Sequence, residues 1–264
     1  MPIITLITDF GTADGYVGAM KGVILGLAPH ATVVDVAHDL PAQDIEAGAW
    51  CLASCWRYFP QGTLHVVVVD PGVGSDRQAI IAEVDGQYLI GPDNGVFTHA
   101  LQRAGKREVR QIPAGFHLPN SLSFTFHGRD IFAYAAGVIA SGERTWKDIT
   151  QAADDFMLLA ISRPDYGDTT IRGRILHVDR YGNLITNIEG DALPGDAQWT
   201  MRIGGADLSI RNIAATYSDV DQGRPVALIG SSGYLEIAVC GGSAYRVFQT
   251  EPGTEISMKR LMSN

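Results

Sequence analysis

The sequence predicts an α/β protein with two domains, and three observations support this prediction. Apolar runs typical of strands alternate with helical patterns up to about residue 150, as in a layered α/β domain. A polar, linker-like stretch follows at residues 162–168. Beyond it, short strand-like runs separated by turns favour a small antiparallel barrel or sandwich. We therefore expect one domain over residues 1–163 and a second over residues 170–264.

The N-terminal domain is predicted to centre on a strand over residues 64–69, which contains four consecutive valines. A continuous apolar run of this kind is typical of a strand that is buried on both faces. Pro71 and Gly72 end it, because proline lacks the amide that a ladder needs and glycine favours a turn. The other predicted strands are 3–8, 32–36, 78–84 and 87–90, and the predicted helices are 15–25, 44–59, 96–104 and 129–140.

The C-terminal domain shows no convincing long helical pattern. Its apolar runs are short and are bounded by turn residues such as those of 179–183 and 230–233, which favours antiparallel pairing. The predicted strands are 171–178, 183–188, 200–203, 208–213, 225–229, 234–239 and 245–249.

Composition and charge argue against several classes of function. The 264 residues carry a net charge of −9 without a cluster of lysine or arginine, so no nucleic-acid partner is expected. The three cysteines have neither zinc-site nor disulfide-framework spacing, so no metal is expected. The first apolar run is short and lacks preceding basic residues, which indicates a strand and not a signal peptide. No run approaches membrane-spanning length, so we expect a cytoplasmic protein with no membrane partner.

The glycine-rich segments do not match cofactor-binding motifs. The spacing of Gly11, Gly15 and Gly18 differs from the dinucleotide-binding fingerprint, and no Walker-type Lys-Ser/Thr pair is present. We therefore expect no cofactor.

Three residues form the strongest candidate for a reactive site. Asp70 follows the valine strand, Arg77 ends the glycine-containing loop after it, and His127 precedes a predicted helix. Ligands bind at the carboxyl ends of strands in open α/β sheets. A carboxylate orients a neighbouring guanidinium, and a histidine exchanges protons near neutral pH. The three side chains could therefore hold a water molecule as a nucleophile. The alternative is a structural salt bridge between Asp70 and Arg77, with His127 at a helix start.

Polar turns supply further candidates. Asp9 ends the first strand, where it either binds sugar hydroxyls or caps a turn or helix. The segment 179–183 is a polar turn between two strands, and the segment 230–234 is either a hairpin turn or a donor-rich pocket for a carboxylate. The residues alone do not decide between these alternatives.

Seven motifs, in order and in both domains, resemble the S-adenosyl-L-methionine (SAM) hydroxide adenosyltransferase family, also called adenosine-forming SAM hydrolases. The resemblance covers essentially the whole chain, and a set of seven motifs in register is highly specific. The motifs lie at Thr8–Gly11, Tyr16–Gly22, Val69–Gly74 with Arg77, Gly91–Gly95, Thr125–Asp130, Asp179–Asn183 with Thr186–Ile188, and Gly230–Ala238.

The resemblance implies a fold, a reaction and an assembly. The implied fold is a Rossmann-like N-terminal domain and a C-terminal β-barrel, in a homotrimer whose sites lie at subunit interfaces. The implied reaction is hydrolysis of SAM to adenosine and methionine, by in-line attack of water at the ribose C5′ and without a metal. Asp70, Arg77 and His127 match the residues that activate this water.

The resemblance also implies residues that bind the substrate. Asp9 matches the acid that holds the ribose hydroxyls. Asp179 and Asn183 match contacts to the methionine amine and the adenine, and Ser231 matches a contact to the methionine carboxylate. Two further residues fall in the segment that borders the nucleoside, namely Tyr217 and Glu236.

Two other functions remain open at this point. SAM-dependent halogenases share the fold but lack the acid and the histidine that match Asp70 and His127, and this sequence has both. A non-catalytic nucleoside-binding protein is the second alternative. The sequence does not say which sulfonium epimer is preferred, although the family is linked to clearing the (R)-sulfonium form.

Overall fold

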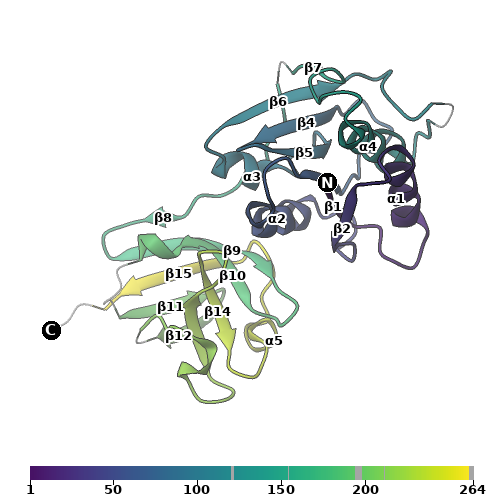
Figure 1. The fold of residues 1–264 in the computed structure, drawn as a ribbon. Helices are drawn as coiled ribbons and strands as arrows, with labels where there is room; N and C mark the ends of the chain where they lie inside the picture. The colour runs from purple at the N-terminus through teal and green to yellow at the C-terminus, as the bar shows by residue number, and fades with distance from the viewer. Residues whose placement is uncertain (120–121, 154, 194–197, 211, 262–264) are drawn as a thin grey trace. The chain divides into compact units, whose positions relative to one another are not determined.

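The computed structural model describes residues 1–119, 122–153, 155–193, 198–210 and 212–261. It confirms the α/β class. The chain divides into two compact units, Met1–Leu159 and Ala160–Asn264, and each unit is built on one sheet (Figure 1).

The first unit contains a mixed sheet with the strand order β2-β1-β3-β5-β4-β6-β7. The strands β1, β2, β3 and β5 run parallel, whereas β4 is antiparallel to both of its neighbours. The strands are β1 (Ile3–Thr8), β2 (Thr32–Ala37), β3 (Leu64–Val68), β4 (Ala79–Val84), β5 (Gln87–Pro92), β6 (Arg107–Ile112) and β7 (Gln151–Ala152).

Helices cover both faces of this sheet. The helices α1 (Tyr16–Leu27) and α4 (Tyr134–Ser141) lie side by side on one face (Figure 1). The helices α2 (Ile45–Cys55) and α3 (Thr98–Arg103) pack on the opposite face. A π-helix, η2 (Gly128–Ala133), leads directly into α4.

The predicted central strand separates two apolar cores. Leu64, Val66 and Val68 pack with the core that includes α1 and α4, and Val67 packs with the core that includes α2 and α3. Successive side chains of a strand point to opposite faces of the sheet. The prediction that this strand is buried on both faces is therefore confirmed.

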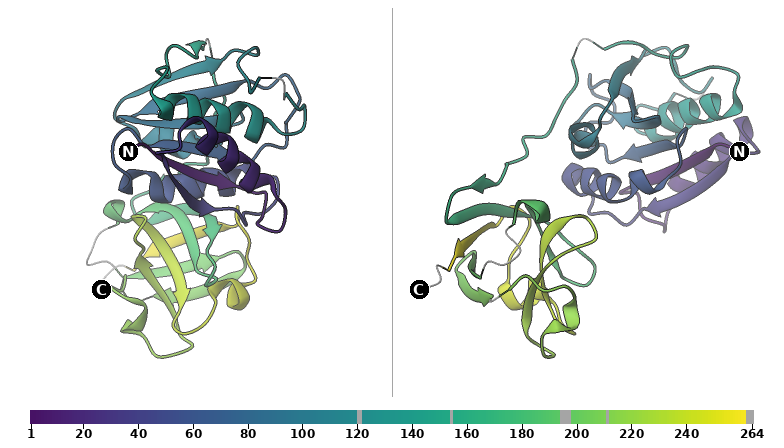
Figure 2. Two further views of the ribbon diagram at one scale, coloured as in Figure 1. Left: turned by 45° about the vertical axis from the view of Figure 1, so that its right-hand side comes forward. Right: turned by 60° about the vertical axis from the view of Figure 1, so that its left-hand side comes forward.

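The second unit contains a curled antiparallel sheet with the strand order β12-β11-β15-β9-β10-β14-β13, in which β8 also pairs with β9 (Figure 2). Its inner face forms one apolar core with Trp199, Leu235 and Met258 among its members. The elements are β8 (Asp165–Tyr166), β9 (Thr170–Val178), β10 (Leu184–Glu189), β11 (Trp199–Ile203), β12 (Ala206–Ile210), β13 (Pro225–Ile229), β14 (Tyr234–Val239), α5 (Ala244–Phe248) and β15 (Glu255–Arg260).

Three details differ from the sequence prediction. The predicted strand 245–249 is wrong, because this segment forms the short helix α5, whose first turn is capped by Ser243 through the amide of Arg246. The strands β6 and β15 were not predicted. The predicted strand 208–213 overlaps β12, and position 211 lies outside the described residues.

Cys51 and Cys55 lie in an unreactive environment. Burial raises the pKa of the Cys51 thiol to about 11 and that of the Cys55 thiol to about 12, so neither is a thiolate near neutral pH. Within the described ranges, we find no cluster of three or more side chains suited to hold a metal ion. The helices described here include none with the length and apolar character needed to cross a membrane.

Candidate functional site

Three predicted site residues lie at the same edge of the first sheet. Asp9 follows β1 and Asp70 follows β3, and these two strands are adjacent and parallel. Arg77 precedes β4, which runs antiparallel to the neighbouring β5, so its start lies at that edge too. This is the edge at which open α/β sheets bind their ligands.

Asp70 and Arg77 form a bidentate ion pair. The Arg77 Nε donates to Asp70 Oδ1 at 2.9 Å and to Oδ2 at 3.1 Å, and its Nη2 also donates to Oδ2. The Asp70 side chain is 4% exposed and that of Arg77 is 10% exposed. A planar fork held in this way has a fixed orientation, so the pair presents the guanidinium in one direction.

His127 joins this pair through Arg77. The Arg77 Nη2 donates to His127 Nδ1 at 2.8 Å. Because arginine is always protonated and has no acceptor, the His127 Nδ1 must accept, and the neutral ring carries its proton on Nε2. Burial and the Arg77 charge lower the pKa of His127 below 6.5. The three candidate catalytic residues therefore meet, with a neutral imidazole whose Nε2–H is a donor.

Close packing between two loops holds the cluster in place. Gly74 has a φ of +78°, and a Cβ there would lie 2.5 Å from the backbone oxygen of Phe124. Only glycine allows the loop of Arg77 to approach the segment before His127 this closely. The fully buried Asp130 also accepts the amide of Ser123 at 2.7 Å, which anchors that segment to η2.

A cavity of about 410 Å³ adjoins this cluster. Arg77 and His127 contribute polar groups to its wall, and Ile112, Leu122 and Phe124 contribute apolar ones. The space is sufficient for several water molecules. Water can therefore reach the guanidinium and the imidazole from the side of β4 and β6.

Within the part of the chain that the structure describes, Asp9 accepts one hydrogen bond, on one of its carboxylate oxygens. Its Oδ2 accepts the backbone amide of Gln43 at 2.7 Å. Gln43 has a φ of +65°, which is rare for a residue other than glycine. The carboxylate of Asp9 thus has a defined orientation and retains free lone pairs for a ligand.

In the second unit, Asp179 closes the turn between β9 and β10. Its Oδ1 accepts the amides of Tyr181 and Asn183 at 2.9 and 2.8 Å, and its Oδ2 accepts the Asn183 side chain at 2.9 Å. Gly182 sits at the tip with a φ of +83°, and a Cβ there would overlap Ser243. The two predicted residues of this turn therefore meet, and the carboxylate serves first as a turn-forming group.

Tyr217 and Glu236 form a second pair in this unit. The Tyr217 hydroxyl donates to Glu236 Oε1 at 2.7 Å. Burial raises the pKa of Glu236, as does the nearby charge of Asp179. Burial, followed by the hydrogen bond to this carboxylate, raises the pKa of Tyr217 to about 12. The hydroxyl is therefore a donor at every physiological pH.

Ser231 lies exposed in the turn between β13 and β14. The turn is closed by Gly230 and Tyr234, whose backbone groups bond at 2.9 Å, and Gly233 has a φ of +83°. The hydroxyl of Ser231 is thus presented to solvent from a rigid turn.

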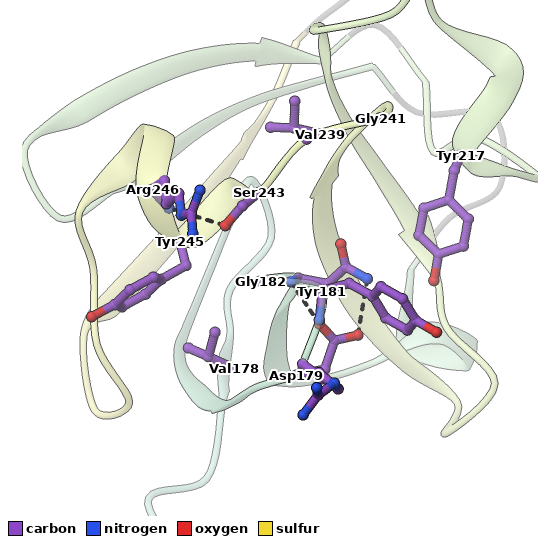
Figure 3. Close-up of a pocket in the computed structure, with 13 residues that line it drawn as sticks. Val178, Asp179, Tyr181, Gly182, Tyr217, Val239, Gly241, Ser243, Tyr245 and Arg246 are labelled. Carbon is purple, nitrogen blue, oxygen red and sulfur yellow. Dashed lines mark hydrogen bonds between the residues drawn. The ribbon is translucent and has the colours of Figure 1, made fainter.

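A cavity of about 1010 Å³ lies beside the Asp179 turn. Asp179, Asn183 and Tyr217 line it, whereas Ser231 and Glu236 do not belong to its wall. Figure 3 shows Tyr181, Tyr217 and Tyr245 around this cavity. The sequence analysis missed the last of these, together with Ser243 and Arg246. Tyr245 and Arg246 fall in the segment 245–249 that was predicted to be a strand, and Ser243 lies just before it. Ser243, a residue type that caps helices, was the available signal.

The fold and the site define a two-unit α/β protein that carries an Asp–Arg–His cluster at the edge of its mixed sheet where β1 and β3 end. Residues 4–150 match the N-terminal domain of the SAM hydroxide adenosyltransferase family. Residues 173–257 match the C-terminal domain of the same family. The chain therefore belongs to the SAM hydroxide adenosyltransferase family.

Individual relatives agree with this assignment. The chain is 34% identical to the (R)-S-adenosyl-L-methionine hydrolase of Methanocaldococcus jannaschii, over 98% of this chain and 96% of that protein. The crystal structure of an uncharacterised conserved protein from Thermotoga maritima has a TM-score of 0.90 at 32% identity, and covers 97% of this chain and 100% of its own. A fluorinase from an Actinoplanes species is more distant, at 26% identity over 90% of each chain.

Proposed function

We propose that this protein hydrolyses SAM, with a preference for the (R)-sulfonium epimer, to adenosine and methionine. The observation that carries the proposal is the cluster of Asp70, Arg77 and His127, in which all three side chains are joined by hydrogen bonds. The likeness to proteins named (R)-SAM hydrolases supports the substrate and its epimer.

The proposed reaction is a one-step substitution at the ribose C5′. The water oxygen forms a bond to C5′ while the C5′–sulfur bond breaks, and the electron pair of that bond stays on the sulfur of methionine. One water proton is released. The leaving group is a neutral thioether, so no general acid is needed. Alignment of the poor nucleophile is the main requirement, and positioning contributes up to roughly 7–11 kcal/mol in ideal intramolecular cases.

We infer a role for each member of the cluster from its hydrogen bonds. Arg77 occupies the Nδ1 of His127, so the ring does not accept the water proton at that atom. The Nε2–H of His127 instead donates to the water oxygen and holds it in place. Among the described residues, Asp70 Oδ1 accepts one hydrogen bond, from the Arg77 Nε. In this proposal its remaining lone pair orients a water hydrogen and receives the released proton.

The remaining candidates bind the substrate in this proposal. Asp9 accepts the ribose hydroxyls with its free oxygen. In the second unit, Asp179, Asn183 and Tyr217 border the larger cavity and contact the amine of methionine and the adenine. Glu236 orients Tyr217, and the exposed Ser231 binds the methionine carboxylate.

Several finer expectations accompany the proposal. We infer a Rossmann-like arrangement of the first domain, over residues 1–163, and a β-barrel over residues 170–264. The homotrimer with shared sites and the cytoplasmic location stay predictions. Light scattering of the active protein tests the trimer, and a fully active monomer would exclude shared sites.

Product analysis tests the function. The purified protein is incubated with epimer-resolved SAM, with and without chloride, and the products are separated by liquid chromatography. Adenosine and methionine, formed faster from the (R) epimer, are the expected result. Formation of 5′-chloro-5′-deoxyadenosine would identify a halogenase instead. Binding of adenosine without turnover of either epimer would identify a nucleoside-binding protein.

A further inference from the structure

A chain of four polar side chains runs behind the loop that carries Asp9. The Lys21 Nζ of α1 donates to Asp35 Oδ2 at 2.5 Å. The other oxygen of Asp35 contacts the Nε2 of His38 at 3.0 Å, and the His38 Nδ1 contacts the hydroxyl of Thr8 at 2.8 Å. Thr8 is fully buried and His38 is 6% exposed. These hydrogen bonds thus connect α1 and β2 to the buried hydroxyl of Thr8 at the end of β1.

The Asp35 carboxylate fixes the donors and acceptors among these four side chains. A carboxylate only accepts, so the Nε2 of His38 carries a proton and donates it to Asp35. In the tautomer without a proton on Nδ1, that atom accepts the hydrogen of the Thr8 hydroxyl, which itself accepts the amide of Phe10 at 3.3 Å. Lys21 also donates to Asp35, so both oxygens of this carboxylate are hydrogen-bonded.

The pairing of β1 with β2 brings these residues to one side of the sheet. Leu6 lies opposite Asp35, but Ile7 lies opposite Ala37, so β2 has one extra residue at this point. His38 follows directly after the end of β2 at Ala37. The extra residue therefore lies between Asp35 and His38, whose side chains contact each other at 3.0 Å.

Both ends of the Asp9 loop depend on His38. On the N-terminal side, its ring holds the hydroxyl of Thr8, which in turn accepts the amide of Phe10. On the C-terminal side, its backbone oxygen accepts the amide of Gly11 at 2.8 Å. The backbone on each side of Asp9 is therefore fixed by the same residue.

A second series of hydrogen-bonded side chains in the same sheet provides a comparison for His38. Thr5 and His65 bond at 2.8 Å, and His65 contacts Gln87 Oε1 at 2.7 Å. It also joins a threonine of β1 to a buried imidazole. None of its three members belongs to the loop of Asp9, so it links strands without touching the candidate site.

We propose that His38 is a positioning residue for ribose recognition. Through Thr8 and through its own carbonyl, it orients the Asp9 carboxylate toward the ribose hydroxyls of the substrate. This inference rests on the proposed function, in which Asp9 is the group that binds those hydroxyls. His38 itself touches neither the substrate nor the reacting atoms.

The test is a ratio of two affinities measured by calorimetry. Adenosine is compared with 2′,3′-dideoxyadenosine, which lacks both hydroxyls. Hydrogen bonds to a charged group are strong enough that we expect the unaltered protein to bind adenosine at least about tenfold more tightly. In His38→Ala and in Thr8→Val, the ratio is expected to fall to about threefold or less. Partial unfolding lowers both affinities equally, so it leaves the ratio unchanged.

Two matched variants complete the experiment. His38→Asn keeps an acceptor near the Nδ1 position, so it should retain most of the preference for adenosine. His65→Ala removes a buried imidazole from the same sheet and should leave the ratio as in the unaltered protein. An unchanged ratio in both His38→Ala and Thr8→Val, or a collapse in His65→Ala as well, would overturn the inference.

Asp9→Asn separates this inference from the proposed function. If Asp9→Asn abolishes the preference and His38→Ala does not, the positioning role of His38 is wrong and the role of Asp9 stands. If Asp9→Asn leaves the preference intact, the proposed role of Asp9 is wrong, and the positioning role of His38 fails with it.

Discussion

The two units each use an aspartate to organise polar neighbours, but they hold different partners. In the first unit, the nearly buried Asp70 holds the Arg77 guanidinium, which in turn holds His127. In the second, Asp179 accepts two backbone amides and the side-chain amide of Asn183. In the first arrangement the aspartate holds a charged guanidinium, whereas in the second it holds the amides of a tight turn. We propose that the first unit performs the chemistry and binds the ribose, and that the second unit binds the methionine amine and the adenine.

The largest effect is expected from Asp70→Asn. The amide cannot serve as the charged partner of Arg77 or as acceptor for the water proton, so kcat should fall at least about 100-fold, as when an electrostatic group is removed from an active site. The affinity for adenosine should change less than about twofold. Steady-state kinetics and calorimetry measure these two quantities.

A matched control uses an Asp–Arg pair in which both side chains are exposed. Asp165 contacts Arg172 at 3.5 Å, and exposed pairs contribute little. Asp165→Asn should therefore keep kcat within about twofold. If Asp70→Asn behaved in the same way, the ion pair of the first unit would be structural only.

Two substitutions of His127 distinguish a donor from a base. Glutamine can place its Nε2–H near the position of the imidazole Nε2–H, whereas alanine cannot. His127→Gln should retain roughly ten times more of kcat than His127→Ala, because one hydrogen bond of this kind is worth about 1–1.5 kcal/mol. Equal loss in both variants would indicate that the ring acts as a base.

The pH profile should follow the neutral form of His127. Burial and Arg77 lower its pKa from 6.5, so kcat should be constant above about pH 6.5 and should fall as the pH drops through the lowered pKa. Protonation at Nδ1 would end the acceptance of the Arg77 hydrogen and place two cations together. Stability should fall in the same acid range, because the unfolded chain binds this proton more readily. A kcat that declined as the pH rose from 6 to 8 would contradict the neutral donor.

The smallest effect is expected in the second unit. Tyr217→Phe removes the donor to Glu236, so KM should rise about two- to fivefold with kcat unchanged, and stability should fall by about 1 kcal/mol. Tyr166→Phe, which removes a hydroxyl that accepts the amide of Glu189, is the control and should leave KM unaltered. A fall in kcat in Tyr217→Phe, with KM unchanged, would contradict the proposal that the second unit only binds the substrate.

The sequence predicted the elements whose own residues determine them. The valine strand and the turn after it placed Asp70 at a sheet edge. By contrast, β6 begins with Arg107 and Glu108, and it is a strand because β4 pairs with it. The helix α5 contains Tyr245 and Val247, residues that favour strands, and the cap at Ser243 prevails over that preference.

The candidate site was predictable in part. The motifs indicated that Asp70, Arg77 and His127 belong together, but the tautomer of His127 follows only from the 2.8 Å contact with Arg77. The contact between Thr8 and His38 lies just beyond an irregular register of β1 and β2. A register shift of one residue has no local sequence signal, which is why the hydrogen bond between Thr8 and His38 was not predicted.

Hydrolysis of (R)-SAM in water enriched in ¹⁸O tests the central claim most directly. Attack of water at C5′ next to the Asp–Arg–His cluster predicts adenosine that carries one ¹⁸O atom, together with unlabelled methionine, and the Asp70→Asn variant should form neither above the spontaneous rate. Unlabelled adenosine, or products in which the C5′–sulfur bond is intact, would contradict the account.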